Sequence, residues 1–200
     1  MAEVTGGTEP AGRTEQTEAG GAADGRVARG RRRRAELLAA ALRVAERDGV
    51  AAVTHRAVAK EAGLADTAGT YYFRTVDELL IAVITTGAQR FADSVRTELP
   101  ADPRIRDLAE LTASYLTEHR GRAIAEYELY LLAARRPELR PAARLWLDAA
   151  RELLSRWTTE EATLRAALAL CDGVLLQGLI ADEPPDADEI ARVFEPLLGR

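Results

Sequence analysis

The hydrophobic pattern of this chain is that of α-helices. From about residue 35 onward, apolar positions recur at spacings of three and four, and no stretch alternates between apolar and polar as a strand does. The first such stripe consists of Leu38, Ala41, Leu42 and Ala45. It predicts a helix that ends at Gly49, a residue suited to a left-handed C-terminal cap. The chain is therefore predicted to be all-α.

Breaks rich in glycine and proline divide the chain into about nine predicted helices. Two short helices, over residues 54–62 and 66–72, follow the first. The longer ones cover residues 76–99, 104–119, 122–135, 138–157, 160–182 and 187–198. Thr75, with Glu78 three residues later, forms a capping box at the start of the first long helix. This order predicts an N-terminal three-helix unit followed by a C-terminal helical bundle.

The two short helices have the organisation of a helix-turn-helix. Ala59 supplies a small side chain where the two helices cross. Gly63 supplies a residue that tolerates a positive φ in the turn, and Leu64 supplies an apolar side chain to fill the angle between the helices. Because these features occur together at the required spacings, they predict DNA binding.

Positive charge is concentrated around this motif. Residues 26–75 contain eleven basic residues and five acids, whereas the segments before and after them are both net negative. Six arginines fall within residues 26–34 with no acid among them. Four consecutive ones are predicted to follow the DNA backbone or to enter the minor groove: Arg31, Arg32, Arg33 and Arg34.

The composition divides the chain into three parts. Residues 1–29 contain mostly small and polar residues and are predicted to be a disordered tail that includes the start of the basic arm. Residues 30–90 form the predicted helix-turn-helix domain, with the motif itself at about 54–73. Residues 91–200 form the predicted helical bundle.

Other classes of protein lack support in the sequence. A single cysteine, Cys171, excludes a disulfide framework and a thiolate zinc site. The longest apolar run, residues 164–181, is interrupted by Arg165 and Asp172, so no membrane span is expected. The N-terminus has no apolar segment typical of a signal peptide. We therefore expect a cytoplasmic protein.

Catalysis is the first alternative to DNA binding. The motifs of serine hydrolases, zinc proteases, dinucleotide-binding folds and P-loops are all missing from the sequence. The two histidines, His55 and His119, are far apart in the chain. We expect no enzyme, no cofactor and no metal site.

Three runs of residues in the N-terminal half have a specific order and spacing. They are Val53-Thr54-His55-Arg56-Ala57-Val58-Ala59-Lys60-Glu61-Ala62-Gly63-Leu64, Thr70-Tyr71-Tyr72-Phe73 and Asp77-Glu78-Leu79-Leu80. Residues 34–84 thereby resemble the DNA-binding domain of the TetR family of bacterial transcriptional regulators. The resemblance implies a homodimeric regulator, which we expect to be a repressor, that binds a palindromic operator in double-stranded DNA. It also implies that residues 91–200 bind a small-molecule effector and form the dimer.

The motif suggests a role for particular residues on DNA. Arg56 is predicted to recognise guanine, because its guanidinium matches the O6 and N7 acceptors together. The predicted phosphate contacts are Thr54, Tyr72 and Arg74, although packing against the first helix is an alternative role for Tyr72. The residues expected near base edges or thymine methyl groups are Thr67, Thr70 and Tyr71, while His55 is expected to contact either bases or phosphates.

The chain departs from the family pattern within the second helix of the motif (residues 66–72), which is the recognition helix. Thr67-Ala68 stands where relatives usually carry Gly-Thr, and Gly69 stands where they carry an apolar residue. A glycine inside a helix costs about 1 kcal/mol relative to alanine. Two interpretations follow: Gly69 lets the backbone approach DNA closely, or the helix is partly unformed until it binds. The departures also motivate a second alternative, a helical interaction protein with degenerate DNA binding.

Reading two successive major grooves requires recognition helices about 34–36 Å apart, and hence at least a dimer. The apolar helix at residues 164–181 and the helix at 190–198 carry more apolar surface than one exposed helix needs. The predicted interface residues are Leu168, Cys171, Leu175, Leu176, Leu179 and Phe194. The alternative is that the first of these helices is the core of the bundle.

The predicted effector pocket combines aromatic side chains with a few polar groups, as ligand sites do. Its predicted residues are Phe91, Tyr115, Glu126, Tyr127, Tyr130, Trp146 and Gln177. For each of them, packing in the core is the alternative role.

Overall fold

A computed structural model describes residues 15–199 of the chain, which form nine α-helices and two 3-10 helices. Their bounds are α1 Glu15–Asp48, η1 Val50–Ala52, α2 His55–Glu61, α3 Thr67–Tyr72, α4 Val76–Glu98, α5 Ile105–Leu116, α6 Arg120–Arg135, η2 Pro137–Leu139, α7 Arg140–Leu154, α8 Glu161–Ile180 and α9 Ala187–Leu198. The all-α prediction, with an N-terminal helix-turn-helix unit and a C-terminal helical domain, is confirmed.

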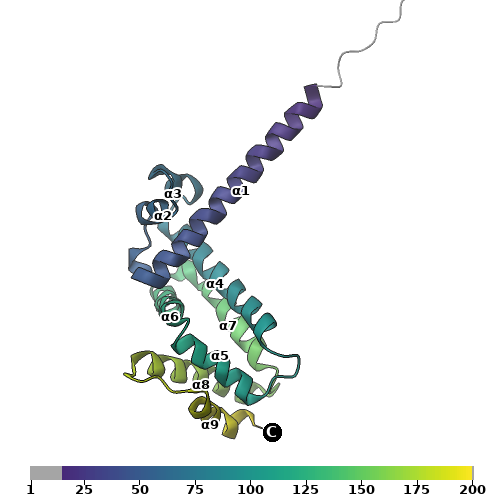
Figure 1. Ribbon diagram of the computed structural model, residues 1–200, viewed down its shortest axis with the longest axis vertical. Coiled ribbons are helices and arrows are strands. Elements are labelled where there is room, and N and C mark those ends of the chain that lie inside the picture. The colour runs from purple at the N-terminus through teal and green to yellow at the C-terminus, as the bar shows by residue number, and fades with distance from the viewer. Residues whose placement is uncertain (1–14, 200) are drawn as a thin grey trace, which may run out of the picture.

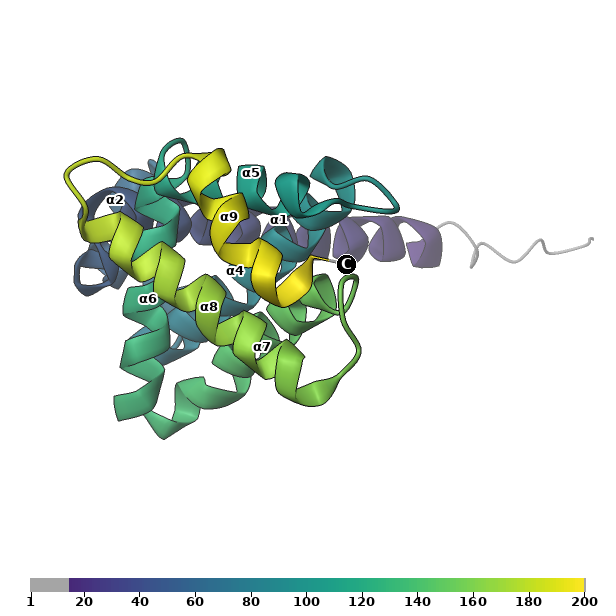
Figure 2. The ribbon, with the colours of Figure 1, turned by 90° about the horizontal axis from the view of Figure 1, so that it is seen from below.

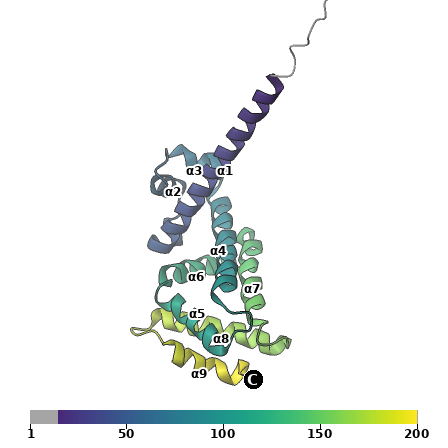
Figure 3. The same cartoon turned by 45° about the vertical axis from the view of Figure 1, so that its right-hand side comes forward.

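The helices form two groups at opposite ends of the molecule, joined by the pair α4 and α7. Helices α2 and α3 lie against α1 at one end, and α5, α8 and α9 lie at the other (Figure 1). Helices α4 and α7 pack side by side between the two ends, and α6 contacts α1, α4, α5 and α7 (Figures 1 and 3). Helix α4 therefore runs from the helix-turn-helix into the C-terminal domain.

Helix α1 begins earlier than the sequence predicts. The predicted tail extends to residue 29, whereas in the structure the helix already begins at Glu15. Residues 15–29 include three glycines, which disfavour helix, as well as alanine, glutamate, glutamine and arginine, which favour it. Extending an existing helix needs no new nucleus, so the amphipathic helix that follows directly supports this extension. The four consecutive arginines consequently lie within a regular helix. Residues 1–14 of the predicted tail lie outside the described residues.

The N-terminal core extends into the C-terminal domain. Its centre is formed by fully buried side chains such as Leu37, Phe73 and Leu79. Leu129 of α6 and Leu139 of η2 belong to the same cluster. Because burial of such side chains contributes about 1.5–3 kcal/mol each, this shared core fixes the helix-turn-helix unit directly against α6 and η2.

A second core joins α5 to α9 at the opposite end. Phe194 and Ile190 of α9 are buried there together with Leu108 of α5. Seen from that end, α8 and α9 lie on the outside of the molecule (Figure 2).

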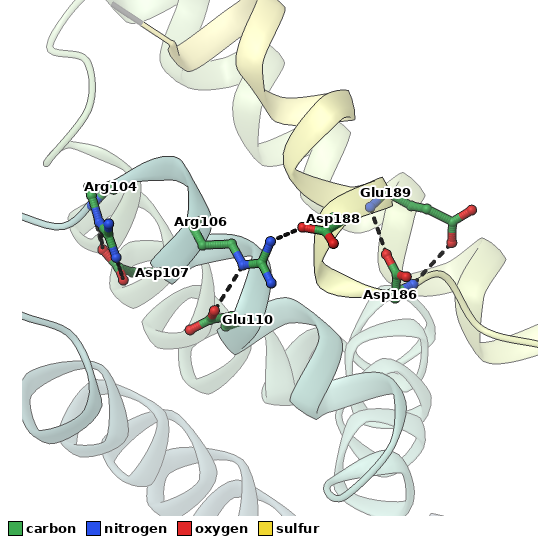
Figure 4. Close-up of polar contacts among 7 residues, drawn as sticks. All are labelled: Arg104, Arg106, Asp107, Glu110, Asp186, Asp188 and Glu189. Carbon is green, nitrogen blue, oxygen red and sulfur yellow. Dashed lines mark hydrogen bonds and ion pairs between the residues drawn. The ribbon is translucent and has the colours of Figure 1, made fainter.

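Polar contacts support this packing. The Asp186 carboxylate accepts a hydrogen bond from the Glu189 backbone N–H at 2.8 Å, which caps the start of α9. Arg106 of α5 pairs with Glu110 on its own helix at 2.9 Å and reaches across to Asp188 of α9 (Figure 4). Since these ion pairs are exposed, the apolar core contributes most of the stability of this end.

Candidate DNA-binding surface and effector cavity

The turn of the helix-turn-helix has the geometry that the sequence predicts. The Thr54 hydroxyl accepts a hydrogen bond from the Ala57 backbone N–H at 3.2 Å and caps α2. Gly63 has φ 66°, and the Leu64 N–H donates to the carbonyl of the fully buried Ala59 at 2.9 Å. These local contacts hold α3 at a fixed angle to α2.

Gly69 and His55 lie where α3 crosses α2. A Cβ at Gly69 would lie 2.8 Å from the His55 carbonyl oxygen, so only glycine allows this close approach of the two helices. Gly69 is buried, and the His55 Nε2 is buried without a hydrogen-bond partner. The structure thus gives a reason for Gly69 that differs from both sequence interpretations: Gly69 is buried in the contact between the two helices, while His55 is half-buried beside it.

The outer face of α3 presents other predicted residues. Tyr71 is 79% exposed, and Thr67 and Thr70 are exposed beside it. Tyr72 is half-buried against the N-terminal core and makes an edge-to-face contact with Tyr71, with ring centroids 4.8 Å apart. The structure therefore brings Thr67, Thr70 and Tyr71 together on one exposed surface and gives Tyr72 the packing role.

Two exposed arginines flank this face. Arg56 of α2 is 86% exposed at its side chain and lies 3.5 Å from the Asp66 carboxylate, just before α3. Exposed ion pairs of this kind contribute little, so Arg56 is available for another anionic or acceptor-rich partner. Arg74 is exposed immediately after α3, and its backbone N–H donates to the Glu78 carboxylate at 2.8 Å.

The four arginines of α1 have different surroundings. Arg34 stacks over the Phe73 ring at 4.7 Å. Arg33 lines a shallow groove with residues of α3, including Thr67 and Tyr71. Arg32 and Arg33 both pair with Glu36, and Arg31 is exposed. Of the four, Arg33 lies beside the exposed face of α3, which makes it the arginine of α1 best placed to act together with that face.

A cavity of about 90 Å³ lies in the C-terminal domain. Six of the seven residues predicted for the effector pocket line it: Phe91, Tyr115, Glu126, Tyr127, Tyr130 and Trp146. The Phe91 ring packs on Trp146 and on Tyr115, with centroids 4.6 Å and 6.1 Å away. Gln177 is the exception, because it is exposed on the outer side of α8. Aliphatic side chains complete a wall that is mostly apolar.

The sequence did not predict three polar residues in or beside the cavity: Asp172, Arg122 and Thr112. Asp172 of α8 lines the cavity and accepts a hydrogen bond from the Tyr127 hydroxyl at 3.0 Å. Arg122 of α6 donates to the Glu126 carboxylate at 2.8 Å. Thr112 also lines the cavity, although its hydroxyl is satisfied by its own helix. An acid within an otherwise apolar helix was the available signal for Asp172.

Burial changes the ionisation of these groups. Loss of hydration raises the pKa of Glu126 to about 8, and the attraction of Arg122 offsets only part of that rise. Burial also raises the pKa of Asp172, which the Tyr127 hydroxyl partly opposes. The pKa of the Cys171 thiol rises to about 12 for the same reason, so this thiol is protonated and unreactive at neutral pH.

The raised pKa of Glu126 predicts how stability depends on pH. A carboxyl group whose pKa is higher in the folded chain contributes stability that is full below its unfolded pKa and is lost as the pH rises through about 8. The free energy of unfolding is therefore expected to fall as the pH rises from about 4.5 to about 8, by at most about 1.4 kcal/mol per pH unit, and to level off above that range. Denaturant titrations should show a flatter slope for Glu126→Gln, while Glu118→Gln, at an exposed position, should keep the wild-type slope. An unchanged slope in Glu126→Gln would contradict this ionisation.

Most of the predicted dimer residues pack within the chain itself. Leu168, Cys171 and Leu175 line the cavity, and Leu179 and Phe194 are buried. Only Leu176, 45% exposed, lies on the outside. The other five have contacts within their own chain, as the core-helix alternative expects. Because α8 is apolar on all sides, its periodicity does not distinguish an inner from an outer face.

The outer face of α8 is apolar nonetheless. Ile180 is 85% exposed, and Val193 of α9 is 45% exposed. A groove between the two helices is lined by small residues, including Ala169 and Gly173. In the part of the chain that the structure describes, α8 alone is long and apolar enough to span a membrane. Here it packs on α5, α7 and α9 with one face and leaves the other uncovered.

A helix-turn-helix with an exposed recognition face, packed on a helical domain, defines a DNA-binding regulator. The family of bacterial regulatory proteins, tetR family, matches residues 37–83, and the tetracyclin repressor-like C-terminal domain matches residues 103–200. The chain belongs to the TetR family of transcriptional regulators, a family of DNA-binding regulators and not of enzymes. This confirms the family resemblance of the sequence motif.

Solved structures of similar proteins agree with this assignment. The multidrug binding protein EbrR in complex with ethidium is 38% identical, with a TM-score of 0.72 over 83% of this chain and 98% of that one. The TetR family member SCO1917 from Streptomyces coelicolor A3 is 37% identical, with the same TM-score and coverage. The transcriptional regulator SCO7518 from Streptomyces coelicolor A3(2) is 26% identical, with a TM-score of 0.72 over 84% of this chain and 99% of that one. Comparison with curated proteins gives no significant match.

Proposed function

We propose that this protein is a transcriptional repressor that binds a palindromic operator as a homodimer and is released by an aromatic organic cation. The proposal rests on the observation that one chain combines a DNA-recognition face with a ligand cavity. An exposed recognition face on α3 is joined by α4 to an aromatic cavity that contains two carboxyl groups.

The chemistry of the cavity favours this class of effector. Aromatic faces attract cations and stack on planar rings, and here they surround Glu126 and Asp172. EbrR has been solved with ethidium, proflavin and malachite green, all of which are aromatic organic cations. Because EbrR is 36–38% identical over most of this chain, the same ligand chemistry is a reasonable first choice.

The link from cavity to DNA runs through α4. Phe91 of α4 lines the cavity, and α4 begins at Val76, three residues after the buried Phe73 at the end of the recognition helix. Ligand sites for drug-sized molecules usually measure about 300 Å³ or more, whereas this cavity measures about 90 Å³. A dye therefore has to move the surrounding helices apart. An effector that binds this widened state more tightly shifts the protein away from its DNA-binding form.

The uncovered faces of α8 and α9 support the dimer. Leu176, Ile180 and Val193 form an exposed apolar surface, and the neighbouring Gly173 and Ala169 permit close approach of a second helix. A twofold pairing through this surface would cover the side chains of both copies at once.

Arg56 provides the test of operator recognition. In fluorescence anisotropy, the protein should bind DNA from beside its gene more tightly than it binds a scrambled duplex. Arg56→Ala should lose about 1–3 kcal/mol of that preference, or roughly five- to 150-fold in the dissociation constant. Arg96→Ala, an exposed arginine of α4 far from the recognition helix, is the matched control and should retain it. Equal binding to both duplexes by the wild type would refute specific recognition of this DNA.

Effector release needs a ligand that does not itself bind between bases, as ethidium does. Tetraphenylphosphonium meets this requirement and is an aromatic cation. It is expected to weaken operator binding of the wild-type protein in a saturable manner. Operator affinity that is unchanged at concentrations that saturate the cavity would refute a release mechanism.

A further inference from the structure

The two carboxyl groups of the cavity have different partners. Glu126 already faces a cation, since Arg122 donates to its carboxylate at 2.8 Å and both side chains are less than one-fifth exposed. Burial alone would lower the pKa of Arg122, but the interaction with Glu126, with a smaller contribution from Glu46 of α1, raises it above its ordinary value, so Arg122 keeps its positive charge. A ligand cation at Glu126 would have to displace Arg122 or accept its repulsion.

Asp172 has only a neutral partner. The Tyr127 hydroxyl donates to its carboxylate at 3.0 Å, and no arginine or lysine within residues 27–199 forms an ion pair with it. A hydroxyl group stabilises a carboxylate without neutralising its charge. A partly buried, unneutralised carboxylate is costly to the folded chain, and an incoming cation removes that cost.

We propose that Asp172, and not Glu126, determines the charge preference of the effector cavity, by placing its carboxylate against the cationic centre of the ligand. The inference rests on the proposed cationic effector and assigns its recognition to one residue. Glu126 remains with Arg122 and acts as part of the wall. The aromatic residues of the cavity, such as Trp146 and Tyr127, supply area and stacking to neutral and cationic ligands alike.

The position of Asp172 also connects the ligand to the proposed dimer surface. Asp172 faces the cavity from α8, and Leu176, one turn later on the same helix, is exposed on the outer side. A ligand held by Asp172 therefore acts directly on the helix that carries the proposed dimer contact.

A pair of matched ligands separates charge from shape. Proflavin is a cation near neutral pH, whereas its parent acridine is neutral under the same conditions. We expect wild-type protein to prefer proflavin to acridine in fluorescence titrations without DNA. Asp172→Asn should weaken proflavin binding ten- to a hundredfold and leave acridine binding within about threefold. The asparagine can still accept the Tyr127 hydrogen bond, so the fold should be retained, as thermal unfolding would verify.

Two further variants complete the test. Glu126→Gln should change the preference for proflavin by less than about threefold. Tyr127→Phe, which removes the hydroxyl and keeps the Asp172 carboxylate, should retain the preference. Equal weakening of both ligands in Asp172→Asn, or loss of the preference in Glu126→Gln alone, would overturn the assignment. Wild-type protein that binds both ligands equally would refute the cationic effector itself.

Discussion

Replacing Gly69 with alanine is expected to weaken specific DNA binding at least tenfold while leaving the effector cavity intact. The new Cβ would lie 2.8 Å from the His55 carbonyl oxygen and 3.0 Å from the His55 Cα. Backbone atoms cannot move aside as a flexible side chain can, so α3 must shift on α2. Overpacking of this kind costs about 1–3 kcal/mol, which exceeds the roughly 1 kcal/mol that alanine gains in helix propensity. Because α3 is only six residues long, packing on α2 is what holds it.

The matched control is Gly87→Ala in the middle of α4. A Cβ there meets no atom within 4 Å, so this variant gains helix propensity without a clash. We expect operator affinity to fall at least tenfold in Gly69→Ala and to stay near the wild-type value in Gly87→Ala. Proflavin binding should be unchanged in Gly69→Ala, because the cavity lies in the second core. Wild-type operator affinity in Gly69→Ala would show that the recognition helix tolerates the shift.

The helix-turn-helix was predictable because its determinants are local. Thr54 caps α2 through a residue three positions away, and Gly63 and Leu64 close the turn on Ala59. Such contacts join residues that are neighbours in the chain, so their spacing in the sequence specifies their geometry. Six of the seven residues predicted for the effector pocket do line one cavity. Large aromatic side chains in an all-helical domain are usually buried, at least in part, in its interior.

The remaining features depend on contacts between distant segments. The close crossing at Gly69 requires knowing that α3 passes over His55, and periodicity does not contain this information. The sequence could not distinguish the inner from the outer face of α8 for the same reason, since an all-round apolar helix is oriented by its neighbours α5, α7 and α9. The role of Asp172 in the cavity depends on Tyr127 of α6, which lies opposite it and is distant in the sequence. Tertiary packing, and not local propensity, decides each of these.

Leu176→Asp is expected to convert the proposed dimer to monomers. Leu176 lies on the exposed apolar face of α8, near the small residues that would admit a second helix. In a twofold interface the substitution occurs twice, so it removes two apolar contacts and places two carboxylates close together. Loss of one buried leucine costs about 1.5–3 kcal/mol. The dimer dissociation constant should therefore rise at least a hundredfold, which light scattering and sedimentation would detect.

DNA binding should weaken with the dimer, since a palindromic operator is bound tightly only when both recognition helices are linked. Leu131→Asp is the matched control, because Leu131 is 63% exposed on α6, away from the outer face of α8. That variant should remain dimeric and bind the operator as the wild type does. Monomeric Leu176→Asp with an unchanged cavity should still bind proflavin, because Leu176 does not line the cavity. A Leu176→Asp protein that stays dimeric would place the interface elsewhere, and dissociation of both variants would point to general destabilisation instead of a specific contact.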